Sequence, residues 1–528
     1  MTIFKNKEEE KETVVLKRYK RSDNRDISTD IIIEKNGSFK QNVGEEEEEI
    51  LDYELDANGD MIRTHGMHWI ITAFCVVGNQ AGGGIVALPS AVIESQFYFG
   101  IILVAVMGFG LGFTGYCIGQ CWVLLQRMYP EYRKHCRRPY AEIGYRAMGP
   151  LVKSIVSVFI WGNLFGTAVV FLLLASKNIH DFMKAFFSGF NVSFCIIVLF
   201  VALFLLPITF LRSPEDFWWT VVASTVATCT AVGLIVFGTL RDYDICEPHR
   251  TMPDFKITNY FLAFATLTFA YAGHSSFPTL QHDMKMPKEF SKSNALGFAI
   301  VVAMYIPVCL VGYLSYGDSL RDSVINSIQT KWIQQTINVT ITLHLILSLT
   351  IVFNPLNQEV EEYFEIPLEF GIKRVIIRLS VMVAIVFVGE SVPSFGPLLD
   401  LVGGALQPFT AIMFPMLFYA YLLTKEKLKK ETMGEWEGIP SISQVFRLCP
   451  KWMIVATFII IILGICGAAA ATYSAILELS TSSFQKPCYF FSDEPNDKGH
   501  TNCCGEYQNI SRYNDLSKCS DAKYDYYT

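Results

Sequence analysis

The sequence has little charge for its length. Only 18% of its 528 residues are Asp, Glu, Lys or Arg, whereas 51% are hydrophobic. The charged residues gather in the first 65 residues, in a few connecting stretches and in the last 50. Between them lie apolar runs of about 20 residues, the length that a helix needs to cross a bilayer core. This composition excludes an ordinary soluble protein and predicts an all-α polytopic membrane protein.

Signs of enzymatic chemistry are also missing. The sequence has no paired His and Asp cluster and no serine elbow at catalytic spacing. Nothing in it indicates nucleic-acid binding, and it lacks the selectivity filter or ring-forming pore element of a channel. We therefore expect no catalytic residue, no cofactor and no metal site. The expected partners are a small-molecule substrate and the lipid bilayer, while the oligomeric state stays open.

The apolar runs predict eleven membrane-spanning helices. They lie near residues 69–93, 99–125, 151–176, 192–211, 217–240, 258–278, 294–315, 335–356, 373–389, 395–422 and 452–477. The first follows a long polar stretch, so it is not a removable signal peptide. We expect a disordered cytosolic tail over residues 1–65, an eleven-span unit over 66–478 and a tail on the other side of the membrane over 479–528.

Lys and Arg residues predict this orientation. With a cytosolic N-terminus, most loop Lys and Arg residues fall on the cytosolic side, where positive flanks are retained. An odd number of spans then places the C-terminal tail outside the cytosol. The tail carries a sequon at Asn509, where we predict a glycan. We expect the plasma membrane rather than a lysosomal or vesicular membrane.

The cysteines of the C-terminal tail are consistent with an oxidising compartment. Four of them allow three disulfide pairings, and the sequence does not choose among these. Cys246, in the loop before the sixth span, is a further candidate partner. The predicted disulfide cysteines are Cys488, Cys503, Cys504 and Cys519.

Two of the predicted spans contain residues that interrupt a helix. In the first, Gly82-Gly83-Gly84 precedes Pro89, and each glycine weakens a helix by about 1 kcal/mol relative to alanine. In the sixth, Gly273 and Pro278 flank the polar segment His274-Ser275-Ser276, which a lipid-facing helix would not tolerate. Close helix packing is the alternative explanation of membrane glycines. Two matched breaks favour a binding site near the middle of the membrane.

The spacing of the breaks adds a prediction about architecture. They lie five spans apart, so the two helices run in opposite directions, as in an inverted repeat of five plus five spans with an eleventh added. A broken helix exposes N–H groups at one half and C=O groups at the other, which suits the carboxylate and ammonium of a zwitterion. The predicted substrate-binding residues are Gly82, Gly83, Gly84, Ile85, Phe269, Ala270, Tyr271 and Gly273.

Residues 82–91, Gly-Gly-Gly-Ile-Val-Ala-Leu-Pro-Ser-Ala, resemble the first-span signature of the amino acid/auxin permease family. The sixth-span block of that family resembles residues 269–274, Phe-Ala-Tyr-Ala-Gly-His, with Pro278, Met284, Lys285, Pro287 and Phe290. The resemblance covers roughly residues 65–477. It implies the fold of the bacterial leucine transporter and a secondary carrier of small amino acids that works by alternating access. A sensor of the same fold that binds without transport is the alternative.

The resemblance also bears on the coupling ion. Sodium-coupled members have an asparagine where this chain has Gly78, although Ser348 matches a hydroxyl that helps them to hold the ion. Asn79 is one residue away, about 100° around the helix, and should point elsewhere. His274 can titrate near neutral pH, or it can brace the broken helix by hydrogen bonding. We therefore expect proton coupling, with sodium as the alternative, and the candidate residues are Gly78, Asn79, His274 and Ser348.

Overall fold

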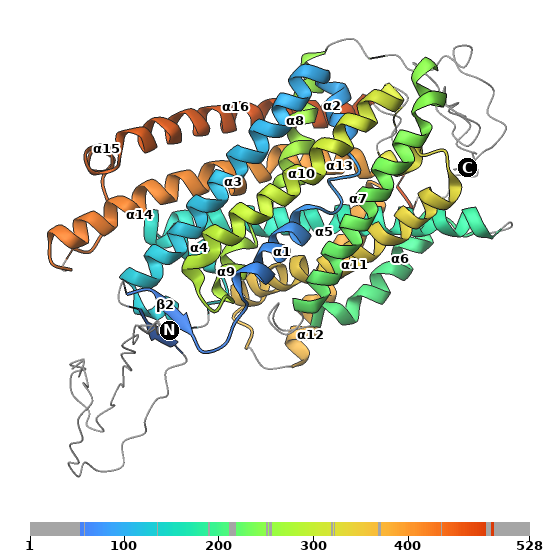
Figure 1. Ribbon diagram of the computed structural model, residues 1–528. Helices are drawn as coiled ribbons and strands as arrows, with labels where there is room; N and C mark the ends of the chain where they lie inside the picture. The colour runs from blue at the N-terminus through green and yellow to red at the C-terminus, as the bar shows by residue number, and fades with distance from the viewer. Residues whose placement is uncertain are drawn as a thin grey trace, which may run out of the picture.

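The structure is a computed structural model that describes residues 53–56, 59–134, 136–187, 191–210, 218–249, 252, 256–317, 320, 323–367, 371–434, 436–481 and 487–489. Within these residues the chain forms one elongated bundle of helices (Figure 1). The helices are α1 Trp69–Gln80, α2 Leu88–Glu94, α3 Phe97–Met128, α4 Pro139–Met148, α5 Pro150–Phe186, α6 Phe194–Leu205, α7 Trp218–Cys246, α8 Ile257–Tyr271, α9 Phe277–His282, α10 Phe290–Tyr316, α11 Lys331–Tyr363, α12 Ile372–Ser391, α13 Phe395–Ala405, α14 Phe414–Glu431, α15 Ile442–Leu448 and α16 Lys451–Thr481. The strands are β1 Tyr53–Leu55 and β2 Met61–Arg63.

Seven helical segments of the described chain are long and apolar enough to cross a membrane. They are Phe97–Met128, Pro150–Phe186, Val222–Cys246, Pro287–Tyr316, Lys331–Tyr363, Phe395–Glu431 and Lys451–Ser480. The shorter apolar helices α1 and α6 lie within the first and fourth predicted spans. The protein is therefore helical and polytopic, while the count of eleven spans and the complete inverted repeat stay predictions.

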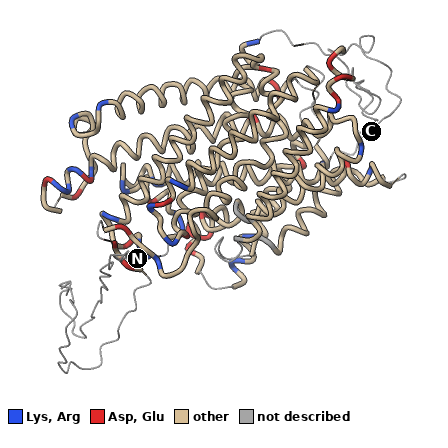
Figure 2. Tube along the Cα trace, viewed as in Figure 1, with Lys and Arg blue, Asp and Glu red and all other residues tan. Residues whose placement is uncertain are grey.

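Charged residues lie mostly toward the two ends of the bundle (Figure 2). Along its middle, α11 packs on α5 and α7, α10 packs on α1 and α3, and α8 packs on α13.

Local sequence explains where α5 begins. Gly149, with a φ of 95°, precedes Pro150 at the start of α5, where the missing N–H of a proline costs no hydrogen bond. Between α13 and α14, residues Pro408–Met413 form a π-helical turn.

A β-hairpin closes one end of the bundle, which we call the hairpin end. Strands β1 and β2 pair antiparallel, with Tyr53 opposite Arg63. The N–H of Arg63 donates to the carbonyl oxygen of Lys285 over 2.9 Å, so the hairpin lies against the segment after α9. Part of the N-terminal segment that we expected to be disordered is therefore folded. Residues 1–52 lie outside the described part of the chain.

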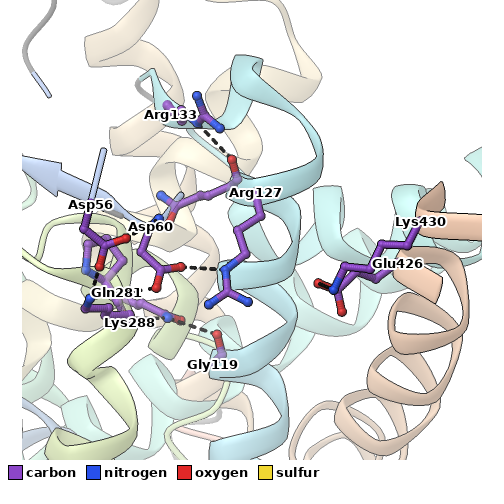
Figure 3. Close-up of polar contacts among 11 residues, drawn as sticks. Asp56, Asp60, Gly119, Arg127, Arg133, Gln281, Lys288, Glu426 and Lys430 are labelled. Atoms are coloured by element: carbon purple, nitrogen blue, oxygen red, sulfur yellow. Dashed lines mark hydrogen bonds and ion pairs between the residues drawn. The ribbon is translucent and has the colours of Figure 1, made fainter. Parts of the chain in front are cut away.

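Ion pairs fix this hairpin to the helices. Figure 3 shows the carboxylate of Asp60 facing the guanidinium of Arg127 on α3, with an Nε to Oδ1 distance of 2.5 Å. The ammonium of Lys288 binds Asp56 and lies 3.8 Å from Asp60. The side chain of Asp60 is 6% exposed and that of Arg127 is 38% exposed, so the pair is partly shielded from water. These contacts join the segment before α1 to both α3 and the segment after α9.

The opposite end carries residues 487–489, and we call it the tail end (Figure 1). There Cys488 forms a disulfide with Cys195, which lies at the start of α6. Cys488 is disulfide-bonded, as predicted, but its partner is Cys195 and neither a tail cysteine nor Cys246. The N–H of Cys488 donates to the carbonyl oxygen of Glu390 in the last turn of α12, so this segment is held by α12 as well as by the disulfide to α6. Cys246 is also disulfide-bonded.

Candidate functional site

The first helix break lies deep in the bundle. Helix α1 ends at Gln80 and α2 begins at Leu88, so residues 81–87 cross the centre without regular helix, and all of them are buried. Within the described residues, the N–H groups of Gly83 and Gly84 have no hydrogen-bond acceptor. Two free donors in a buried segment are a direct means of binding an anion.

The second break lies directly against the first. Helix α8 ends at Tyr271 and α9 begins at Phe277. A Cβ added at Gly84 would lie 2.6 Å from the Cα of Ala270, so only glycine lets the two backbones approach this closely. Met67, before α1, pairs with Met284, after α9. The two broken helices therefore run in opposite directions, with their breaks in contact.

Three side chains bind the two breaks together. Gln80 donates to the carbonyl oxygen of Tyr271 over 2.9 Å, and Asn79 donates to that of Gly273 over 3.2 Å. The hydroxyl of Tyr305 on α10 lies 2.8 Å from the carbonyl oxygen of Ala270. The carbonyls that we expected to face an ammonium thus already accept hydrogen bonds from the protein. Each carbonyl oxygen has a second lone pair, so a further donor can still bind.

Apolar rings surround the free N–H groups. A Cβ added at Gly83 would lie 3.0 Å from the ring of Phe171 on α5 and 3.5 Å from Leu174. The ring of Phe171 meets that of Phe269 edge to face, at a centroid distance of 6.4 Å. Ile85 is fully buried in the same region. The surroundings of these donors are therefore apolar and closely packed.

His274 braces the second break. Its Nε2 lies 3.0 Å from the carbonyl oxygen of Leu111 and 3.1 Å from the hydroxyl of Thr114, both on α3. Its Nδ1 has no hydrogen-bond partner among the described residues. Next to it, Ser275 accepts a hydrogen bond from Asn163 of α5 over 2.5 Å. The polar segment that interrupts the sixth predicted span thus faces protein and not lipid.

Ser348 joins α11 to α1 beside the first break. Its hydroxyl donates to the carbonyl oxygen of Gly78 over 3.0 Å. Gly78 therefore contributes a backbone oxygen here, although it has no side chain to offer. The amide of Asn79 donates instead to the carbonyl oxygen of Gly273 in the other break.

The sequence did not single out His344. This residue lies on α11, one helical turn before Ser348, and its Nε2 is 3.1 Å from the Ser348 hydroxyl. A Cβ added at Gly82 would overlap that same nitrogen. The available signal was the spacing His344 to Ser348, which places two polar side chains on one face of a predicted span. The sequence also did not single out Gln80, Asn163 and Tyr305. Asn163 and Tyr305 are single polar residues in apolar runs, and Gln80 directly follows Asn79.

Two kinds of predicted site stay without a structural account. Asn509, Cys503, Cys504 and Cys519 lie outside the described residues. In the described part of the chain, no group of three or more His, Cys, Asp or Glu side chains is placed to hold a metal ion. The chemistry available at the breaks is therefore hydrogen bonding by backbone groups, hydroxyls and imidazoles.

Comparison with known proteins is consistent with these features. The family described as "Transmembrane amino acid transporter protein" matches residues 65–476, which include both breaks. The chain is 25% identical over 381 residues to "Amino acid transporter AVT1J" of Arabidopsis thaliana, covering 69% of this chain and 85% of that protein. It is 23% identical over 408 residues to "Amino acid transporter AVT1D" of the same plant, covering 76% of this chain and 68% of the relative. It is 27% identical over 190 residues to "Lysine histidine transporter-like 1", also from Arabidopsis thaliana, covering 34% of this chain and 42% of that protein.

Proposed function

The chain belongs to the family of transmembrane amino acid transporter proteins, which matches residues 65–476, and on this premise we propose that it is a secondary carrier of small amino acids. In this proposal the protein works by alternating access and is coupled to protons. It is an integral membrane protein of a transporter family and not an enzyme.

One observation carries the proposal, namely the contact of the two broken helices at Gly84 and Ala270. The free N–H groups of Gly83 and Gly84 offer a substrate carboxylate two donors in a buried place, where such hydrogen bonds are strong. The second lone pairs of the carbonyls at the end of α8 offer acceptors to the ammonium. This pair of complementary backbone groups supports recognition of the part that all amino acids share.

The packing around Gly83 supports a small substrate. Phe171 and Leu174 lie within contact distance of the position that a side chain at Gly83 would take. A substrate bound there has to share this region with two large apolar side chains. A short or apolar amino acid side chain fits these surroundings better than a long charged one. Burying a polar group without a hydrogen bond costs on the order of 2–7 kcal/mol, and burying an unpaired charge costs more.

Alternating access in this proposal rests on the connection between α1 and α8. Gln80, Asn79 and Tyr305 tie the ends of the two helices, so the two breaks would move as one unit. The ion pairs of Asp60 at the hairpin end would have to open when the site faces that side. The disulfide at Cys195 would keep the tail end joined to α6 throughout.

Uptake into reconstituted vesicles tests the proposal. Purified protein would be placed in liposomes and tested with each of the twenty labelled amino acids under an imposed pH gradient. A carrier accumulates at least one small amino acid above equilibrium, and Gly83→Val removes this accumulation. Binding without accumulation would instead identify a sensor of the same fold.

A further inference from the structure

A polar cluster of uncharged groups surrounds His344 in the middle of α11. The imidazole is fully buried and lies between α1 and α7. Its partners are the hydroxyls of Ser224, Thr228 and Ser348 and the carbonyl oxygen of Ser224. A buried imidazole with hydrogen-bonding groups at both nitrogens is rare in a membrane span and indicates a functional position.

At the Nδ1 side of the ring, the hydroxyl of Thr228 lies 2.6 Å away and that of Ser224 lies 3.1 Å away. The Thr228 hydroxyl is also 3.0 Å from the carbonyl oxygen of Ser224. Thr228 can therefore either donate its proton to Nδ1 or turn it to that carbonyl and accept a proton from Nδ1.

The Nε2 side has the same arrangement. The hydroxyl of Ser348 lies 3.1 Å from Nε2 and 3.0 Å from the carbonyl oxygen of Gly78 on α1. Ser348 can donate to Nε2, or it can donate to Gly78 and accept from Nε2. Ser348 therefore joins α11 to α1 at this point only when its hydroxyl donates to Gly78.

Both protonation states of the ring can thus be satisfied without moving the backbone. When the imidazole is neutral, one of the two hydroxyls donates to the bare ring nitrogen. When it is protonated, both ring nitrogens donate, and Thr228 and Ser348 turn their protons to the carbonyls of Ser224 and Gly78. His274 has no such freedom, because its Nδ1 lacks a partner among the described residues.

In the described part of the chain, no charged side chain forms a hydrogen bond or an ion pair with the His344 ring. The α-helices packed on α11 are α1, α5, α7 and α12, and the short 3-10 helices Leu206–Phe210 and Val324–Ser327, which also pack on it, carry no ionisable side chain. On α12, Arg374 and Arg378 both bind Glu361 near the C-terminal end of α11. On α5, Asp181 lies 3.7 Å from His180. Asp242 accepts hydrogen bonds from Tyr316 and Gln329. The thiols of Cys75 and Cys229 are not among the partners of the ring.

We propose that His344 binds and releases the coupled proton beside the first helix break. The inference rests on the proposed transport function and names the group that carries its ion. When the bare ring nitrogen is Nε2, a proton from the aqueous side binds it, and Ser348 turns its own proton from Nε2 to the carbonyl oxygen of Gly78, which bonds α11 to α1. Since Nε2 lies against Gly82, the positive ring stands next to the free N–H groups of Gly83 and Gly84. Proton binding and carboxylate binding therefore strengthen each other.

His344→Gln tests this proposal, because a carboxamide keeps hydrogen bonds to Thr228 and Ser348 but cannot take up a proton. In proteoliposomes we expect the variant to lose accumulation driven by a pH gradient, at least tenfold, and to lose the accompanying current. Exchange of labelled for unlabelled amino acid at equal pH on both sides should continue. His65→Gln, at an exposed histidine outside both breaks, is the matched control and should keep pH-driven accumulation. Full pH-driven accumulation and current in His344→Gln would overturn the proposal.

Two further measurements separate the remaining outcomes. If His344→Gln also stops exchange, Ser348→Ala decides: a displaced pH profile of accumulation supports a proton site at the ring, and an unchanged profile contradicts it. If the wild type binds an amino acid without moving it, the transport proposal fails but the proton site is still tested. In that case the affinity for the amino acid should depend on pH in the wild type and not in His344→Gln, and equal pH dependence in both would refute the site.

Discussion

The hydroxyl of Ser348 lies 3.0 Å from the carbonyl oxygen of Gly78, and this hydrogen bond joins α11 to the last turn of α1. It lies between the imidazole of His344 and the first helix break. A change at the imidazole can therefore reach the segment that offers free N–H groups to a carboxylate. This connection is the basis of the account of coupling, and the predictions below test it together with the rest of the fold.

Gly83→Val should lower amino acid uptake at least tenfold while the protein still reaches the membrane. A valine side chain would collide with the Phe171 ring, which lies 3.0 Å from a Cβ at this position. It would also resist the non-helical backbone that glycine permits. Gly110→Val is the matched control, because nothing lies within 4 Å of a Cβ at Gly110. Normal uptake by Gly83→Val at normal surface level would remove the first break from the site.

Asp60→Asn should release the hairpin from α3. The change leaves Arg127 without its carboxylate, and losing a partly shielded pair of this kind costs about 1–3 kcal/mol. We expect faster protease cleavage near residues 59–67 and a changed rate of transport. Glu289→Gln, which removes a surface pair with Lys292, is the control and should alter neither. Equal protection of the hairpin in Asp60→Asn and wild type would show that the ion pair does not hold it.

Digestion without reducing agent should release a linked peptide pair that contains Cys195 and Cys488. The structure places both in one disulfide with a sequence separation of 293. Cys195→Ser should abolish the linked pair and lower the stability of the protein by roughly 2–4 kcal/mol. Cys466→Ser, at an exposed free cysteine, should leave both unchanged. Recovery of Cys488 linked only to another tail cysteine would contradict the position of residues 487–489.

Glycosidase treatment should shift the protein on a gel, and Asn509→Gln should abolish the shift. This follows from the predicted orientation, which places the C-terminal tail outside the cytosol, where sequons are modified. Modification of the tail by a reagent confined to the cytosol would reverse the orientation of all the spans.

Sequence patterns predicted the two helix breaks because the cause is local. Three successive glycines before Pro89 weaken a helix, and the structure has no regular helix over residues 81–87. The polar segment at His274 was predicted in the same way. The general properties of helix ends predict free backbone groups near Gly83. They do not predict that Gln80 and Tyr305 donate to the carbonyl oxygens at the end of α8.

Other features depend on contacts between distant parts of the chain. His344 is one polar residue in an apolar run, and its role is visible only when Thr228 of α7 and Gly82 lie beside it. The hairpin formed by β1 and β2 is short and charged. It is held by contacts with a distant segment, namely the hydrogen bond of Arg63 to the carbonyl oxygen of Lys285 and the ion pair of Asp56 with Lys288. The partner of Cys488 could not be read from the tail, since Cys195 lies in a different span.

Uptake measured at about pH 5.5 and about pH 7.5, each with sodium and with choline in its place, tests the central claim most directly. The account predicts uptake several-fold faster at acid pH, with an inward current, whether or not sodium is present. Gly78 offers no side-chain oxygen to a sodium ion, and the imidazole of His344 lies beside the Ser348 hydroxyl that such an ion would need. Uptake that disappears in choline at both pH values would contradict proton coupling and show that the protein depends on sodium.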